Sequence, residues 1–140
     1  MKVLFICVAN SGRSVMAERL LRQQSRSHEA RSAGSNPGMA AHPQVVEALR
    51  EIGIDASDHR PRKLDDDAIH WADVVVSTCG EEACPVTPPG TRRIYWNLPD
   101  PKNQPLGRVR EIRDDIARRV ESFLTELDSG ATDRYTRKWP

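Results

Sequence analysis

Short apolar runs alternate with amphipathic segments along this chain, and that alternation restricts the possible folds more than any other feature. Residues 2–7 and 72–78 are apolar runs with the length of buried strands, and residues 29–33 and 92–96 predict two further short strands. Four segments with helical periodicity or helix-start residues predict helices: residues 14–24, 43–52, 66–71 and 107–127. Strands that alternate with helices predict an α/β fold built on a parallel sheet.

Length and composition fit one soluble domain. The chain has 140 residues, of which 38% are hydrophobic and 29% charged, and its formal net charge is +1. No apolar run approaches the ~20 residues of a membrane span, and a balanced charge gives no support to nucleic-acid or membrane-surface binding. We therefore expect a monomeric domain over residues 1–128, a polar tail over 129–140, and no nucleic-acid or membrane partner.

The chain contains three cysteines: Cys7, Cys79 and Cys84. Three thiols cannot all pair within one chain, and residues 3–9 are too short and too soon followed by charge to be a secretory leader. Disulfide frameworks belong to oxidising compartments. We therefore expect a cytoplasmic protein whose cysteines are available for chemistry.

Three reactive side chains follow predicted strands. Cys7 ends the first strand, Cys79 follows the third, and Asp100 comes after the fourth. Reactive groups of α/β folds gather at the carboxyl ends of the strands. The sequence therefore predicts one site that contains all three residues.

The first strand leads into a loop with the pattern Cys-x5-Arg-Ser, after which a helix is predicted. Five residues between Cys7 and Arg13 can curl into a cup whose N–H groups point inward, and the helix adds its own free N–H groups and its positive end. Arg13 can close the cup with two parallel hydrogen bonds. The cup suits a tetrahedral oxyanion, and the candidate residues are Val8, Ala9, Asn10, Ser11, Gly12, Arg13 and Ser14.

The same positive field favours a thiolate at Cys7, which makes it a candidate nucleophile. Ser14 is expected to cap the helix and to donate a hydrogen bond to the sulfur, while the Asn10 amide holds the loop and Gly12 permits unusual backbone angles. A plainer alternative is a buried structural cysteine with Arg13 on the helix surface. The strand before the loop, the helix after it and the adjacent serine favour the oxyanion site.

The segment VLFICVANSGRSVMAE resembles the active-site segment of the low-molecular-weight tyrosine phosphatase fold, and the resemblance extends over about residues 2–127. It implies a single domain with a four-stranded parallel sheet and helices on both faces. Within this fold the chain is more similar to the thioredoxin-coupled arsenate reductases. The features that decide this are Ser32-Ala33-Gly34, the pair Cys79 and Cys84-Pro85, and the segment YWNLPDP that ends in Asp100-Pro101.

The resemblance implies a relay of three cysteines, without a cofactor or a metal ion. Cys7 attacks arsenate held by the loop and Arg13, and Asp100 protonates the departing oxygen. Cys79 then attacks Cys7 and releases arsenite, and Cys84 attacks Cys79 so that thioredoxin can reduce the resulting disulfide. Because Cys79 must meet two partners in turn, we expect residues 79–90 to move between the steps.

Several departures and alternatives stay open. Relatives commonly have six residues between the two relay cysteines, whereas this chain has four. Some relatives bind potassium, and Asn10, Glu18 and Ser32 match three of the ligands, but the fourth position is Arg62, so we expect a weak or absent potassium site. Lys102-Asn103-Gln104 stands where phosphatases carry the aromatic wall of their substrate slot.

Other roles for Cys79 and Cys84 would imply other functions for the protein. Two idle thiols in a loop would leave a low-molecular-weight protein-tyrosine phosphatase, which uses Cys7, Arg13 and Asp100 alone. A zinc site would need His59 or His70 besides Cys79 and Cys84. A non-catalytic oxyanion-binding or redox-sensing protein is a third possibility.

Overall fold

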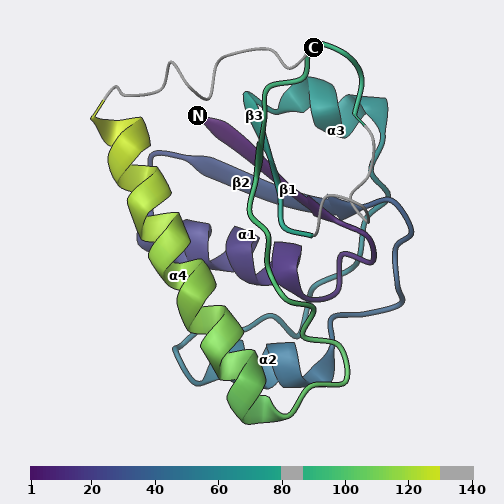
Figure 1. Ribbon diagram of the computed structural model, residues 1–140, viewed down its shortest axis with the longest axis vertical. Coiled ribbons are helices and arrows are strands. Elements are labelled where there is room, and N and C mark those ends of the chain that lie inside the picture. Colours follow the sequence, from purple (N-terminus) through teal and green to yellow (C-terminus); the bar gives the residue numbers. More distant parts are fainter. Residues whose placement is uncertain (80–86, 130–140) are drawn as a thin grey trace.

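The computed structural model describes residues 1–79 and 87–129 and confirms the predicted α/β architecture (Figure 1). Four parallel strands form one sheet in the order β2-β1-β3-β4. In chain order the elements are β1 (Lys2–Cys7), α1 (Arg13–Gln24), β2 (Glu29–Gly34), α2 (Pro43–Arg50), α3 (Asp66–Trp71), β3 (Val74–Ser77), β4 (Arg93–Tyr95) and α4 (Leu106–Asp128).

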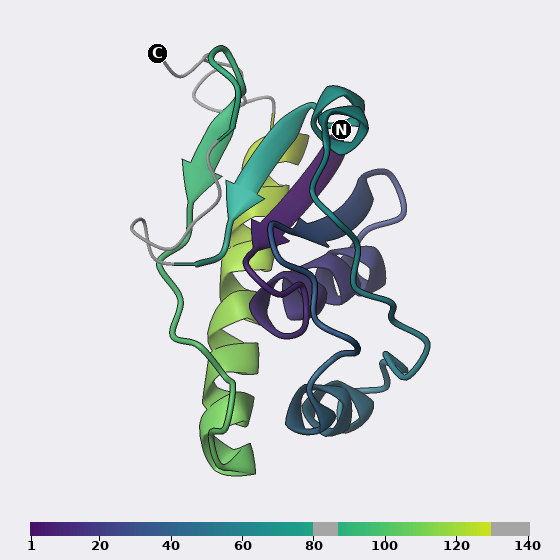
Figure 2. The same cartoon turned by 90° about the vertical axis from the view of Figure 1, so that its right-hand side faces the viewer.

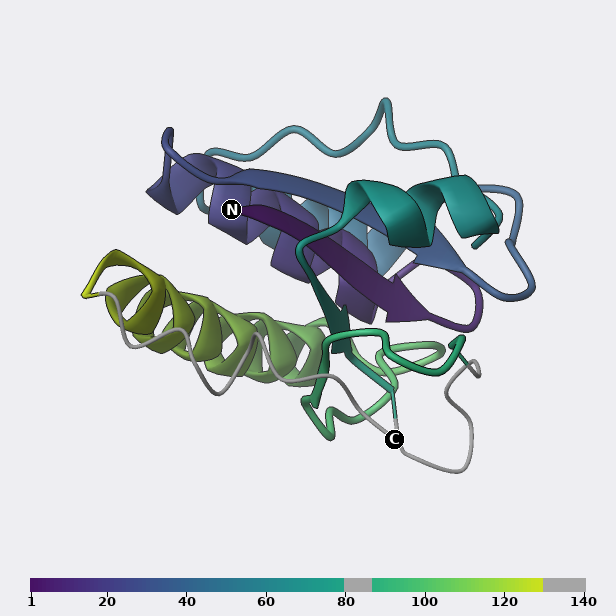
Figure 3. The same ribbon diagram turned by 90° about the horizontal axis from the view of Figure 1, so that it is seen from above.

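The central strand β1 is buried on both faces, because helices cover both sides of the sheet. Val3 and Phe5 point into the larger core, which α1, α2 and α4 fill. Leu4 and Ile6 point into a smaller core beneath α3. Figure 2 shows the strands side by side with α4 along one face, and Figure 3 shows α3 and α4 on opposite sides of the strands. Helices therefore lie on both faces, as expected.

The apolar residues at helical spacing in the last helix pack α4 into the larger core. All six periodic positions are buried: Val109, Ile112, Ile116, Val120, Phe123 and Leu127. Trp96 joins this core between Phe5 and Phe123, with ring centroids 5.7 and 5.9 Å away. Each such aromatic contact contributes about 1 kcal/mol beyond burial.

Several element ends differ from the predicted ones. The second helix stops at Arg50 instead of residue 52, because Gly53 adopts φ 82° and donates to Arg50 O while Ile54 N reaches back to Leu49 O. This is the usual glycine-terminated helix end. The third and fourth strands are shorter than predicted, at Val74–Ser77 and Arg93–Tyr95.

The sheet register places the segments that follow β1 and β3 side by side at one edge of the sheet. Cys7 pairs with Gly34, and Ile6 pairs with Ser77, so the chain that leaves β3 passes directly beside the loop that leaves β1. Helix α4, the last element of the described chain, stops at Asp128. Within the described part of the chain, no helix is both long and apolar enough to cross a membrane.

Candidate active site

The Cys7 thiol lies at the base of the loop between β1 and α1 and is 3% exposed. Two groups of the loop reach its sulfur: Ser14 Oγ at 2.9 Å and the backbone N–H of Asn10 at 3.2 Å. Since α1 starts beside this sulfur, its positive end and its free N–H groups face the same place. The arrangement suits an anion bound above the sulfur.

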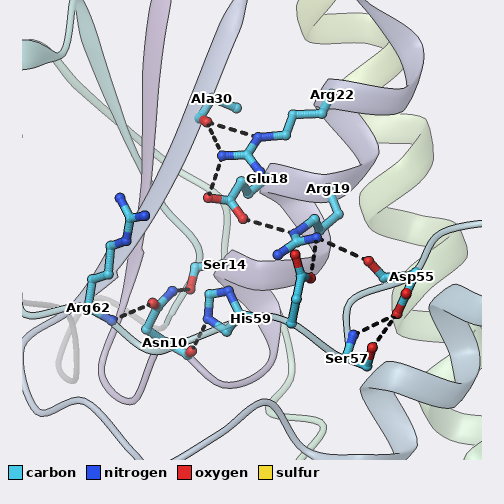
Figure 4. A network of polar contacts seen from close by, with 11 residues as sticks. Asn10, Ser14, Glu18, Arg19, Arg22, Ala30, Asp55, Ser57, His59 and Arg62 are labelled. Atoms are coloured by element: carbon cyan, nitrogen blue, oxygen red, sulfur yellow. Dashed lines mark hydrogen bonds and ion pairs between the residues drawn. The ribbon is translucent and has the colours of Figure 1, made fainter.

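Asn10 fixes the shape of the loop. Its φ of 52° lies in the left-handed region, which asparagine tolerates better than most residues. Its side-chain amide donates to Ser14 Oγ at 2.9 Å and accepts from the backbone N–H of Arg62 at 3.0 Å (Figure 4). The amide therefore joins the loop, the first turn of α1 and the segment before α3.

Ser14 does not cap the helix, which corrects one expectation. Helix α1 begins at Arg13, its N-cap is Gly12, and no side chain caps it. The Ser14 hydroxyl instead lies between the Cys7 sulfur and the Asn10 amide. Because the Asn10 amide donates to Ser14 Oγ, the hydroxyl proton is free to point at the sulfur. A cap would have used that hydroxyl on the backbone.

Arg13 and Asp100 meet at the mouth of the loop. Arg13 donates to Leu98 O at 3.0 Å, and its guanidinium lies 4.0 Å from the Asp100 carboxylate. Asp100 is 57% exposed and also accepts the backbone N–H of Lys102 at 2.9 Å. The carboxyl group is therefore held beside Arg13 at the rim of the loop and remains open to solvent.

Cys79 reaches the same edge through its neighbour Thr78. Both the backbone N–H and the hydroxyl of Thr78 donate to Ile6 O, each at 2.9 Å. Ile6 is the residue directly before Cys7. Cys79 is 1% exposed and disulfide-bonded, whereas Cys7 is a free thiol. Cys84, and the part of the expected moving segment at 80–86, lie outside the described residues.

Comparison with known proteins decides the family. The model of the low molecular weight phosphotyrosine protein phosphatase family matches residues 2–132. The chain belongs to this family. An arsenate reductase of Staphylococcus epidermidis is 33% identical over 125 residues, which is 88% of this chain and 95% of that protein.

Solved structures of two members resemble this one closely. An arsenate reductase from Archaeoglobus fulgidus has a TM-score of 0.79 and 31% identity, and the match covers 89% of this chain and 99% of the other. A thioredoxin-dependent arsenate reductase from Corynebacterium glutamicum has a TM-score of 0.76 and 36% identity, and the match covers 92% of this chain and 62% of the other. The loop of Cys7 is thus the loop of a phosphatase-family domain.

The potassium site of some family members does not fit this chain. Both Glu18 oxygens pair with guanidinium groups, Arg19 at 3.3 Å and Arg22 at 3.3 Å, and the carboxylate is nearly buried. Arg62 stands at the fourth position, with its guanidinium pointing away from the network (Figure 4). Ser32 Oγ is buried without a hydrogen-bond partner among the described residues. Arginine already neutralises the Glu18 carboxylate, so these residues do not fit a bound potassium ion.

No zinc-type cluster is present either in the described part of the chain, where no three His, Cys, Asp or Glu side chains gather as metal ligands do. His59 has a different task, since its Nε2–H donates to Asn10 O at 2.9 Å. A carbonyl can only accept, which sets the tautomer of the neutral ring. His59 therefore braces the loop between β1 and α1.

His59 makes the stability of the domain depend on pH. Burial lowers the pKa of His59 below its usual value of 6.5, although the hydrogen bond to Asn10 O and the charge of Glu18 oppose the shift. A histidine with a lowered folded-state pKa binds its proton more readily when unfolded, so stability falls as pH drops below about 6.5. We expect the free energy of unfolding of His59→Gln to fall less than that of the native chain between pH 7.5 and 5.5 in urea titrations.

The exposed His70 supplies the matched control for that measurement. We expect His70→Gln to follow the native chain at both pH values. An identical pH slope in His59→Gln and the native chain would contradict the bracing role.

Two contributors to the site carried no signal in the sequence. Leu98 offers its carbonyl to Arg13, and Thr78 offers two donors to Ile6 O. No sequence motif marks either contact. Arg13 binds a backbone carbonyl, which any residue could supply, and Thr78 and Ile6 lie 72 positions apart. The pairing of β1 with β3 alone puts Thr78 within reach.

Proposed function

We propose that this protein reduces arsenate to arsenite by a relay of Cys7, Cys79 and Cys84, with thioredoxin as the electron donor. The observation that carries the proposal is the placement of Cys79 at the edge of the oxyanion loop, where Thr78 binds the carbonyl before Cys7. A phosphatase needs only Cys7, Arg13 and Asp100 and has no use for a second cysteine there. The arsenate reductases among its relatives support the same conclusion.

The first step uses the loop of Cys7. Its thiolate attacks arsenic(V), Arg13 and the N–H groups of the loop hold the remaining oxygens, and a sulfur–arsenic bond forms. Asp100 lies at the rim beside Arg13 and delivers a proton, so that one oxygen departs as water. General acid catalysis of this kind contributes about 10²–10⁴ in rate.

The second step transfers the electrons. The Cys79 thiolate attacks the Cys7 sulfur, the sulfur–arsenic bond breaks, and its electron pair stays with arsenic, which leaves as arsenite. The two thiols have then lost two electrons, as a Cys7–Cys79 disulfide. Cys84 next attacks Cys79 and frees Cys7, and thioredoxin reduces the Cys79–Cys84 disulfide. A monomer in the cytoplasm stays our expectation for the working protein.

Two cysteine variants separate the relay from simple hydrolysis. We expect Cys84→Ser to release about one arsenite per protein in a single turnover and then to stop as a Cys7–Cys79 disulfide. Cys79→Ser should release less than about a tenth of that amount, because no thiol resolves the sulfur–arsenic bond. Rapid quench followed by arsenite analysis and mass spectrometry of the disulfides measures both.

The native chain with thioredoxin, thioredoxin reductase and NADPH is the control. Sustained turnover of Cys84→Ser would contradict the relay. No arsenate turnover in the native chain, together with rapid hydrolysis of phosphotyrosyl peptides, would assign the phosphatase function instead.

A further inference from the structure

Arg93 is a buried cation that the relay leaves without a task. It lies at the start of β4 with 5% exposure, opposite Val75 of β3. Burial lowers the pKa of its guanidinium, yet arginine keeps its charge at neutral pH. A buried charge is costly to desolvate unless its contacts compensate for the loss of water. Its contacts therefore indicate what it does.

The guanidinium of Arg93 joins two points that flank the second cysteine. Its Nε donates to Ser77 Oγ at 2.6 Å, and its Nη1 donates to Thr87 Oγ1 at 3.2 Å. It also lies 4.6 Å from the centre of the Tyr95 ring, which supports its orientation. Ser77 comes two residues before Cys79, and Thr87 comes three residues after Cys84.

The chain before Cys79 is held from both sides. Thr78 binds Ile6 O on the side of β1, while Ser77 O accepts Trp96 N and Ser77 Oγ accepts Arg93 on the side of β4. Ser77 and Thr78 are both fully buried. Small displacements of a reacting group cost large factors in rate, so fixing this chain matters to the thiol at its end.

We propose that Arg93 is a positioning residue for the cysteine relay: by holding Ser77 and Thr87 together, it keeps Cys79 in place for attack on Cys7 and keeps the two ends of the Cys84 segment close. The proposal rests on the proposed function. A planar guanidinium with several donors suits this task, because it bonds two hydroxyls in fixed directions. Lysine has a single side-chain nitrogen, so it cannot bond both hydroxyls in these fixed directions.

The test compares Arg93→Gln with Arg92→Gln, which removes the same charge from the neighbouring, half-buried position. Fully reduced protein is mixed with arsenate without thioredoxin, and arsenite release is followed by rapid quench. We expect release to slow about tenfold or more in Arg93→Gln, to keep its native rate in Arg92→Gln, and to be intermediate in Arg93→Lys. A native rate in Arg93→Gln would overturn the proposal.

Alkylation of Cys7 by iodoacetamide, with and without inorganic phosphate, measures whether the oxyanion loop is intact, independently of Cys79. We expect Arg93→Gln to match the native chain in the alkylation rate and in the protection that phosphate gives. Loss of that protection would show that Arg93 acts on the whole site, which also overturns the proposal. If Arg93→Gln does not fold, as judged by circular dichroism, Thr87→Val and Arg93→Lys carry the test with a smaller expected slowing.

A redox titration distinguishes a failure of this proposal from a failure of the proposed function. In a Cys7→Ser background, equilibration with glutathione gives the effective concentration of Cys79 and Cys84 toward each other. We expect Arg93→Gln to lower it about tenfold and Arg92→Gln to leave it unchanged. If Arg93→Gln lowers the effective concentration but the native chain makes no arsenite, the proposed function is refuted and the positioning role stands. If Arg93→Gln leaves the effective concentration unchanged, the positioning role is refuted.

Discussion

Cys7→Ser should lower arsenate turnover by a factor of about 10³ or more while leaving the fold intact. Arsenate reduction needs two electrons from sulfur, and an oxygen at this position cannot form a disulfide. The smaller hydroxyl still fits beside Ser14 Oγ and the Asn10 N–H, which lie 2.9 and 3.2 Å from the sulfur. Turnover is measured as thioredoxin-dependent NADPH oxidation with arsenate.

Phosphate binding and thermal unfolding are the controls for the Cys7→Ser measurement. The loop and Arg13 remain, so we expect the variant to bind inorganic phosphate in calorimetric titrations and to unfold within a few degrees of the native chain. Residual turnover above about 1% of the native rate would show that another group reacts with arsenate first.

Gly34→Ala should destabilise the domain by about 2–3 kcal/mol and reduce turnover at least tenfold. Gly34 ends β2 and pairs with Cys7. An added Cβ would overlap Val8 O and would lie 2.9 Å from Asn10 N. Backbone atoms cannot rotate away as a side chain can, so the oxyanion loop itself must move. Urea unfolding and arsenate turnover measure the two effects.

Gly107→Ala is the matched control for Gly34→Ala. Gly107 lies in the first turn of α4, and no atom lies within 4 Å of its added Cβ. Alanine favours a helix over glycine by up to about 1 kcal/mol, so we expect this variant to be slightly more stable and fully active. A Gly34→Ala variant as stable and as active as Gly107→Ala would mean that the overlap at Gly34 is relieved without moving the loop.

The fold followed from local patterns because each element is marked within its own residues. The six apolar positions of α4 recur at helical spacing, and all are buried. The boundaries were less predictable where tertiary contacts decide them. Helix α2 ends two residues early at its glycine turn, and Ser14 leaves its expected capping role because the Cys7 sulfur and the Asn10 amide compete for its hydroxyl.

The local arrangement of the loop from Cys7 to Ser14 was predictable for a similar reason. Cys7, Arg13 and Ser14 lie within eight consecutive residues, so their spacing alone limits how they can be arranged. Long-range partners gave no such signal. His59 bracing Asn10 O and Arg13 binding Leu98 O join positions 49 and 85 residues apart. No spacing rule covers such contacts, because only the packed chain sets those distances.

The sequence by itself determined the α/β class, the Cys-x5-Arg-Ser loop after the first strand, and two thiols and one carboxyl group that follow strands. The tertiary structure alone decided which groups surround them. Pairing of β1 with β3 and of β3 with β4 puts Thr78 against Ile6 O and Arg93 against Ser77 Oγ. Local patterns encode elements because their interactions are short in sequence, whereas neighbours across a parallel sheet depend on the topology of the whole chain.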